Sequence, residues 1–387
     1  MALPGFSVHD PKFEIDIADQ EVGLGIQELV KSVEYESADG MADILRVILQ
    51  NPTSRQKPQG ILTDLKMFQP GNEISVRMGY GLVEHIGRGV LIAQSPNFAQ
   101  SGFPTIQLTA YSKDHEMMKN APEEGKKRIY QKPAEIGDIL ETVAGRYSFE
   151  VDAPEAFELG RTLTQKAGVS DFDFITGLAN MAGAAFWVDA DADGVWTLHW
   201  RLPDDKSRLP DQQDKERTFT YGVENATLFA FKPEFAIRES VTKLKVIVRN
   251  PQKGKTFIEE FEEDASEHPD VAAAGDPEED VDAPVATGGS AKLFFGKFSF
   301  DIVPNKKFKT AAEVKKWAEQ WFRRNRENFV TGRGKTIGIP DLRARQVHIL
   351  EGIGTTYSGP YYFARVKHKM SDSEGYVCDF SARKVLP

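Results

Sequence analysis

Two stretches near the end of the chain decide the fold: Gly352-Ile-Gly-Thr-Thr-Tyr-Ser-Gly-Pro-Tyr-Tyr-Phe-Ala-Arg-Val-Lys-His368 and Gly375-Tyr-Val-Cys-Asp-Phe-Ser-Ala-Arg383. The first alternates two sets of side chains with the period of a pleated strand, Tyr362, Ala364 and Val366 against Tyr361, Phe363 and Arg365. Residues 370–375 between the stretches are small, polar and permissive, as a hairpin turn requires. The pattern predicts two strands joined by a turn and preceded by a tight glycine corner.

Ten positions in this region form a pattern of glycines, then Tyr-Ser-Gly-x-Tyr-Tyr, then Val-x-His and Gly-Tyr. They are Gly352, Gly354, Tyr357, Gly359, Tyr361, Tyr362, Val366, His368, Gly375 and Tyr376. This pattern resembles the C-terminus of the phage tail-hub family. That family includes the late control protein D proteins of contractile-tailed phages and the N-terminal hub part of the type VI VgrG spike proteins.

The composition is that of a globular chain with two or three domains. Of its 387 residues, 27% are charged and 40% are hydrophobic. Its apolar runs are short, which predicts no membrane insertion by this chain, and its start lacks the pattern of a secretory signal. The single cysteine, Cys378, excludes an intramolecular disulfide and a multi-cysteine metal site. These features fit a protein that is assembled in a cytoplasm.

The net charge of −10 comes from one segment. Residues 259–282 hold twelve acidic residues and no Lys or Arg, so the remaining body is almost neutral. Such a body does not favour nucleic-acid binding as the main activity.

Residues 1–120 read as strands. Apolar and alternating runs at 44–49, 74–78, 87–93 and 106–111 recur at the spacing of a small barrel or sandwich. The string from Gly71 to Tyr80, then Gly89, 96–98, 108–111 and His115, is similar to the first barrel of the hub family. Residues 1–120 are therefore predicted to form a first tube-like β-barrel domain.

Residues 121–215 change to a helical period and are predicted to form an α/β linking domain. Ile136, Ile139, Leu140 and Val143 make one apolar stripe of a helix. A second helix is predicted from Ser170, with Asp173 completing an approximate capping box. Residues 186–188 and 196–200 then read as a hairpin.

Residues 216–387 are predicted to form a second tube-like β-barrel domain. Strand periodicity returns at 241–248, and the acidic segment of about 259–290 is expected to be a flexible inserted loop. Thr310 and Glu313 form a capping box before a helix of about 311–329, whose basic face is solvated or, less favoured, binds nucleic acid.

Three local patterns imitate functional sites without completing them. Asp189-Ala-Asp-Ala-Asp-Gly194 begins like an EF-hand loop, but its twelfth position is Trp200, which favours a hairpin turn. Residues 332–336 imitate part of a phosphate-binding loop but lack its upstream glycine and its following helix. The seven histidines include no pair at helical metal-binding spacing. The sequence therefore predicts no catalytic, cofactor-binding or metal-binding residues and no cofactor.

Taken over nearly the whole chain, the resemblance implies an α+β, mainly β fold. It implies two small hub-type β-barrels joined by an α/β domain, with the acidic loop inserted in the second barrel. It further implies a non-enzymatic baseplate hub, a homotrimer that adapts the hexameric tail tube to a separate trimeric spike protein. Other implied partners are baseplate proteins and the tape measure protein, in a virion tail assembled in the host cytoplasm.

Two other functions stay open at this point. Abundant carboxylates and the phage-like context allow a tail-associated peptidoglycan hydrolase. A carbohydrate-binding β-sandwich would use exposed aromatic side chains such as Trp187 and Trp200.

Overall fold

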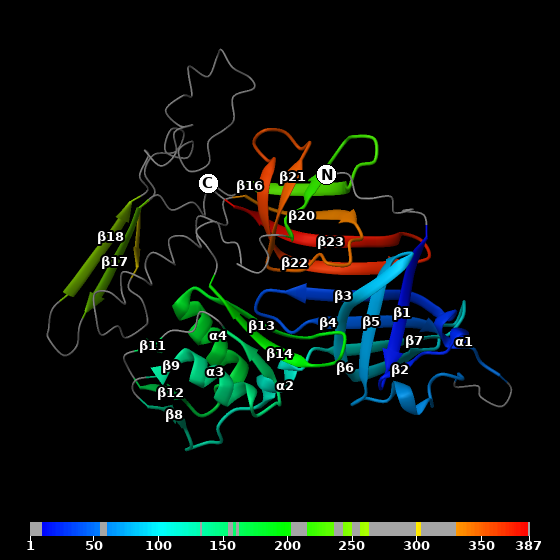
Figure 1. Ribbon diagram of the computed structural model, residues 1–387, viewed down its shortest axis with the longest axis horizontal. Helices are drawn as coiled ribbons and strands as arrows, with labels where there is room; N and C mark the ends of the chain where they lie inside the picture. Colours follow the sequence, from blue (N-terminus) through cyan, green and yellow to red (C-terminus); the bar gives the residue numbers. More distant parts are fainter. Residues whose placement is uncertain are drawn as a thin grey trace, which may run out of the picture.

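A computed structural model of the protein describes residues 10–54, 60–131, 134–153, 158–159, 162–202, 215–235, 243–249, 256–262, 299–302 and 330–385 (Figure 1). The predicted helix of 311–329 and most of the acidic segment lie outside the described residues. Residues 259–262, which we expected at the start of the flexible loop, belong to a β-strand.

The first strand group follows the predicted runs. It contains a short helix, a 3-10 turn and seven strands: β1 (Pro11–Ile17), β2 (Gln20–Glu21), α1 (Leu24–Gln27), β3 (Val30–Ala38), β4 (Ile44–Gln50), η1 (Lys66–Phe68), β5 (Glu73–Tyr80), β6 (Leu82–Asn97) and β7 (Thr105–Tyr111). The strand expected at 87–93 is the centre of the much longer β6.

The α/β unit combines three helices with short strands: α2 (Asp114–Lys119), β8 (Arg128–Tyr130), β9 (Ala134–Glu135), α3 (Ile136–Ala144), β10 (Glu150–Asp152), β11 (Glu158–Leu159), β12 (Leu163–Gln165), α4 (Asp171–Ala182), β13 (Ala185–Ala190) and β14 (Trp196–Arg201). All four residues of the predicted α3 stripe are buried. Ser170 caps α4 by accepting a hydrogen bond from the Asp173 amide, as predicted.

The second strand group contains β15 (Thr218–Thr220), β16 (Leu228–Phe235), β20 (Val330–Ile337), β21 (Gln346–Glu351), β22 (Gly359–Ser371) and β23 (Gly375–Lys384). A separate three-stranded sheet contains β17 (Lys243–Arg249), β18 (Thr256–Glu262) and β19 (Ser299–Ile302).

The two strand groups share one sheet. Its order is β16-β20-β23-β22-β3-β4-β7-β6-β5-β1-β2; β21 also pairs with β22, and β15 pairs with β21, which makes 13 strands. The seam is the antiparallel ladder between β3 and β22, running from Arg365 opposite Ala38 to Ser371 opposite Ser32; the two strands lie side by side in Figure 1. One hydrophobic core contains residues of both groups, from Ile15 to Ala382. The fold is α+β and mainly β, as expected.

A β-bulge corrects the predicted faces of β22. The register shifts between Phe363 and Arg365, so strict alternation fails at Ala364. Tyr361 and Phe363 face the main core before the bulge and Val366 faces it afterwards, whereas Tyr362 packs in a small separate cluster. The prediction that Tyr362 and Val366 share a face was therefore wrong. A bulge inserts one residue and reverses the side-chain phase beyond it.

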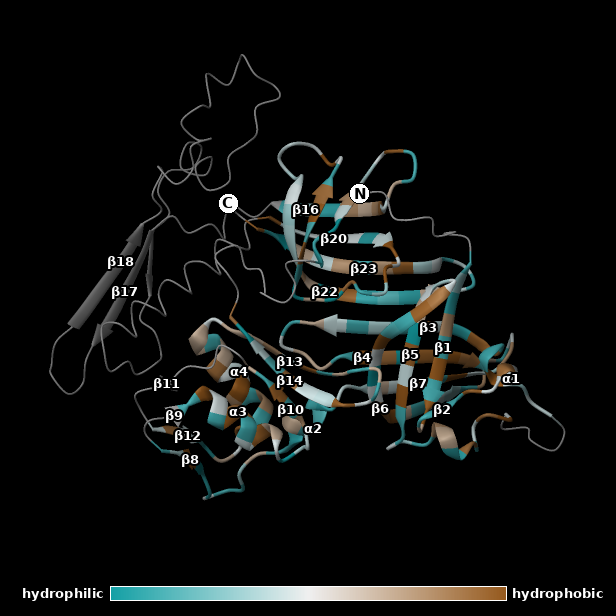
Figure 2. Cartoon of the chain, in the orientation of Figure 1, coloured by the Kyte–Doolittle hydropathy of each residue, from teal (hydrophilic) through white to brown (hydrophobic). Residues whose placement is uncertain are grey.

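The α/β unit has its own core. Helices α3 and α4 cover one face of the sheet β10-β14-β13, and buried residues of both helices pack against Phe186, Val188 and Leu198 (Figure 1). Hydrophobic and hydrophilic residues alternate along the strands of the large sheet (Figure 2). The opposite face of the hairpin β13–β14 turns toward the first strand group, where β13 contacts β6.

We predict that strand β22 does not tolerate proline at Lys367. Lys367 lies in β22 opposite Glu36 of β3 and Asp379 of β23, so its main chain has a neighbouring strand on each side. Lys367→Pro removes a ladder donor and leaves a carbonyl unpaired, which should cost at least about 2 kcal/mol of unfolding free energy.

The matched control is Lys367→Ala. It removes only partly exposed ion pairs with Glu34 and Glu36 and should cost less than about 1 kcal/mol. Denaturant unfolding of both variants measures the difference. Equal stability of the two would show that main-chain pairing of β22 with its neighbouring strands does not stabilise the fold.

Candidate functional site

The ten motif residues lie in one corner and the two strands that follow it. Gly352, Gly354, Gly359 and Gly375 all have positive φ angles, which glycine adopts without strain. A Cβ on Gly352 would lie 2.3 Å from the Tyr221 carbonyl oxygen, so no other residue fits there. The corner is closed by the Tyr361 hydroxyl, which donates to the Tyr357 carbonyl at 2.6 Å. Val366 and Tyr376 are buried in the main core.

His368 is fully buried and holds a neighbouring segment in place. Its Nε2 lies 2.7 Å from the Leu342 carbonyl oxygen, which can only accept, so Nε2 carries the proton. Its Nδ1 accepts from the Tyr376 hydroxyl at 2.8 Å. Burial lowers the pKa of His368 to about 3, and the nearby Arg343 adds to that effect. The imidazole is therefore neutral and structural.

The segment that contains Leu342 also carries Arg343 and Arg345, and both arginines contact other parts of the chain. Arg343 donates to the His85 carbonyl of β6 at 3.0 Å. Arg345 is 4% exposed, and its guanidinium stacks over the Trp187 ring of β13 at 4.7 Å. Its backbone has a φ of +72°, an unfavourable value for a non-glycine residue. Arg345 thus joins the second strand group to the α/β unit.

Beside Arg345 lies a set of buried polar residues that we call the junction cluster: Tyr35, Asp43, Ser112, Asp114 and Arg345. Tyr35 donates to the Asp43 carboxylate at 2.6 Å, and its ring passes over Gly87, where a Cβ would lie 2.1 Å away. Ser112 accepts from the Asp43 amide at 2.8 Å and donates to Asp114 at 2.5 Å. Burial raises the pKa of Asp43 to about 6 and that of Asp114 to about 7.

Two carboxyl groups with raised pKa values are a pattern of active sites. Here Asp43 is 4% and Asp114 2% exposed, and both lie where the three parts of the chain meet. A polymer substrate cannot reach them in this arrangement. The pair is a structural feature of the junction.

A second polar group binds three strands of the α/β unit together. His199 of β14 lies 3.1 Å from Asp152 of β10 and 2.9 Å from Asp189 of β13, and its ring stacks on Trp187. Burial opposes the charged imidazole, but the two carboxylates outweigh it and raise the pKa of His199. Because Asp189 is engaged with His199 and Trp187, the EF-hand-like stretch is a hairpin turn. Among the described residues, no group of three acidic, His or Cys side chains could hold a metal ion.

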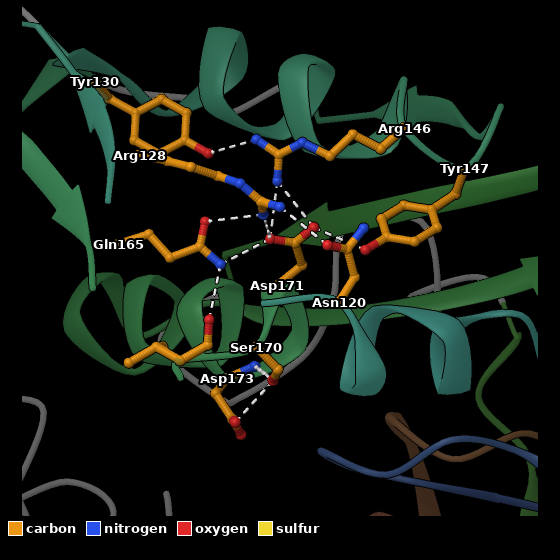
Figure 3. A network of polar contacts seen from close by, with 10 residues as sticks. Asn120, Arg128, Tyr130, Arg146, Tyr147, Gln165, Ser170, Asp171 and Asp173 are labelled. Carbon is orange, nitrogen blue, oxygen red and sulfur yellow. Dashed lines mark hydrogen bonds and ion pairs between the residues drawn. The ribbon is translucent and has the colours of Figure 1, made fainter. Parts of the chain in front are cut away.

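Asp171 organises a third polar group at the start of α4 (Figure 3). Its carboxylate is fully buried and accepts from Arg128, Arg146, Gln165 and Tyr147 at 2.5–2.8 Å. The two arginines neutralise the carboxylate, and the helix N-terminus favours its charge. With all its acceptor positions used, Asp171 fixes helix α4 against β8 and β12.

The carbohydrate-binding interpretation was wrong about its residues. Trp187 is 7% exposed and lies between His199 and Arg345, and Trp200 is fully buried in the core of the α/β unit. Neither ring can stack on a sugar.

A family model described as the Alg8 N-terminal domain matches residues 53–372, more than half of the chain. The chain belongs to the Alg8 N-terminal domain family. No curated protein sequence matches it.

Solved structures with the same fold include tail proteins and a type VI secretion component. A tail protein from Neisseria meningitidis superposes with a TM-score of 0.65 at 10% identity, covering 98% of this chain and 100% of that one. A 43 kDa tail protein of prophage MuSo2 from Shewanella oneidensis gives 0.66 at 11%, covering 96% and 98%. An Escherichia coli type VI secretion component, similar to T4 tail proteins gp27 and gp5, gives 0.53 at 9%, covering 98% and 77%. The α+β, mainly β fold class implied by the tail-hub resemblance is confirmed for this Alg8 N-terminal domain family member.

Sequence reasoning found the ten motif residues but missed the junction cluster. One signal was available: Asp43 directly precedes the strand at 44–49, and Ser112 and Asp114 follow the strand at 106–111. Since β4 and β7 pair with Ile44 opposite Tyr111, these strand ends meet. Arg345 and Asp171 gave no local signal.

We predict that Asp171→Asn lowers the unfolding free energy by about 3 kcal/mol or more, because it leaves Arg128 and Arg146 without their buried carboxylate. Asp173→Asn, on the same helix turn, should cost less than about 1 kcal/mol. Denaturant unfolding compares the two. Similar losses in both variants would contradict a special role for Asp171.

His199 should make stability depend on pH. Its pKa is raised in the folded state, so its contribution is present below about pH 6.5, the unfolded value, and is lost as pH rises through the folded pKa. Wild type should therefore exceed His199→Gln in stability by more at about pH 6 than at about pH 9. Thermal unfolding at both pH values tests this. A difference that is constant or grows with pH would refute the assignment.

Proposed function

We propose that this protein is the structural baseplate hub of a contractile tail or a phage-like injection system. Its fold is shared with a bacterial tail protein, a prophage tail protein and a type VI secretion component. The observation that carries the proposal is the β3–β22 ladder, which fuses two strand groups into one body. Continuous main-chain pairing holds the two strand groups in one fixed arrangement, which suits a part that joins a tube to a spike.

The proposed assembly is a homotrimer that adapts symmetries. Two strand groups per chain, in three chains, present six quasi-equivalent units to a hexameric tail tube, while the other end keeps threefold symmetry for a separate trimeric spike. Contacts of this obligate kind bury more than about 2,000 Å². Other baseplate proteins and the tape measure protein are further proposed partners, and the virion tail is the proposed location.

The same proposal makes the protein non-enzymatic. The three polar groups described above are accounted for by contacts within the chain, and the carboxyl pair with raised pKa values is buried. Among the described helices, none is long and apolar enough to cross a membrane.

The oligomeric state tests the proposal. Light scattering at micromolar concentration should give the mass of three 43.2 kDa chains, either for the protein alone or with its spike protein. Images of these particles should show a threefold ring with a central hole. Monomers under both conditions would overturn the trimer, and clearing of a peptidoglycan zymogram would favour the hydrolase instead.

A further inference from the structure

The junction cluster lies where three parts of the chain meet. Tyr35 of β3, Asp43 just before β4 and Ser112 just after β7 belong to the first strand group, whereas Asp114 is the first residue of α2 in the α/β unit. Arg345 comes from the segment before β21. Across from them, β13 of the α/β unit presents Trp187 and Asp189. The packing of the α/β unit on the large sheet therefore depends on the charges of these side chains.

The two carboxyl groups are linked within the cluster. The Ser112 hydroxyl is shared between them, since it accepts from the Asp43 amide and donates to the Asp114 carboxylate. The Arg345 guanidinium donates to the Ala38 carbonyl at 3.2 Å and lies 4.0 Å from Asp39, and its charge also acts on both carboxyl groups of the pair. Both carboxyls are removed from water almost completely, which favours their neutral form.

Charges reach the pair from every neighbouring element. Arg343 and Arg345 favour ionisation of Asp43, whereas Asp189 of β13 opposes it across the interface. Arg345 favours ionisation of Asp114, and Asp43 opposes it, so the two carboxyls disfavour each other's charge. Tyr35 donates to Asp43. His85 of β6 and His368 of β22 lie in the same region and are held neutral by burial.

We propose that Asp43 and Asp114 form a proton-operated latch that seats the α/β unit on the large sheet. With the pair protonated, Arg345 carries the only charge of the cluster, and β13 stays docked through the contact of Trp187 with Arg345. When both carboxyl groups ionise, their charges require hydration, and the charge of Asp43 repels that of Asp189. Separation of β13 from the sheet admits water and relieves this repulsion. The latch is a property of the single chain and does not depend on the oligomeric role proposed above.

The direction of the effect follows from linkage. Asp43 and Asp114 bind their protons more tightly in the folded state than at about pH 3.9, the unfolded value, so their contribution is full below that pH. It is lost as pH rises through about 6 for Asp43 and about 7 for Asp114. The buried neutral histidines act in the opposite direction, because they favour the folded state as pH rises. A melting curve reports the sum of the two effects. The test must therefore measure the opening of β13 itself and compare wild type with variants.

Hydrogen exchange of β13 in the full chain provides that comparison. In wild type, the opening constant of residues 185–190, corrected for intrinsic exchange, should rise about tenfold to hundredfold between about pH 5 and pH 8. Asp43→Asn with Asp114→Asn mimics the protonated pair and should abolish this rise. Asp193→Asn, an exposed carboxylate in the β13–β14 turn, is the matched control and should behave as wild type. An equal rise in the double variant would overturn the latch.

A second measurement needs no variant. Infrared spectra of wild type with labelled aspartate should show two protonated carboxyl groups at about pH 5 that ionise toward neutral pH. A spectrum in which every aspartate is already ionised at that pH would also overturn the latch, whether or not the double variant folds.

Discussion

In the ladder between β3 and β22, main chains from opposite ends of the protein pair directly; Lys367 and Glu34 are 333 positions apart. The entropy cost of closing such a long loop grows only with the logarithm of its length. Everything between the two strands can therefore vary in length without breaking the seam. The α/β unit lies within this interval, as an insertion between two halves of one sheet.

Two kinds of contact hold the molecule together, and they do different things. The main core is apolar and continuous across the seam, so it supplies stability without fixing direction. The contact with the α/β unit is richer in polar groups, such as Arg345 on Trp187 and His85 donating to the Ala190 carbonyl at 3.0 Å. Hydrogen bonds and stacked rings require defined angles, so they fix how the unit is oriented.

Strand and helix positions could be predicted because their signals are local. The stripe of α3, the cap of α4 at Ser170 and the hairpin at 186–200 each depend on residues a few positions apart. The pairing of β3 with β22 could not, because alternation identifies a strand but not its neighbour. The bulge at Ala364 was missed since nothing in Tyr-Tyr-Phe-Ala-Arg marks an extra residue. Arg345 has no local sequence signal that predicts its burial, because its partner Trp187 is far away in the chain.

Contacts connect the C-terminal motif to the junction cluster through the segment that contains Leu342 and Arg345. Tyr376 and the Leu342 carbonyl fix the tautomer of His368, and His368 in turn holds the segment that contains Leu342. Within that segment, the Arg345 amide donates to the Phe363 carbonyl at 2.7 Å, which helps to keep its strained backbone in place. In this backbone conformation the guanidinium lies against Trp187. A motif with no chemistry of its own thereby determines how the α/β unit, far away in sequence, sits on the sheet.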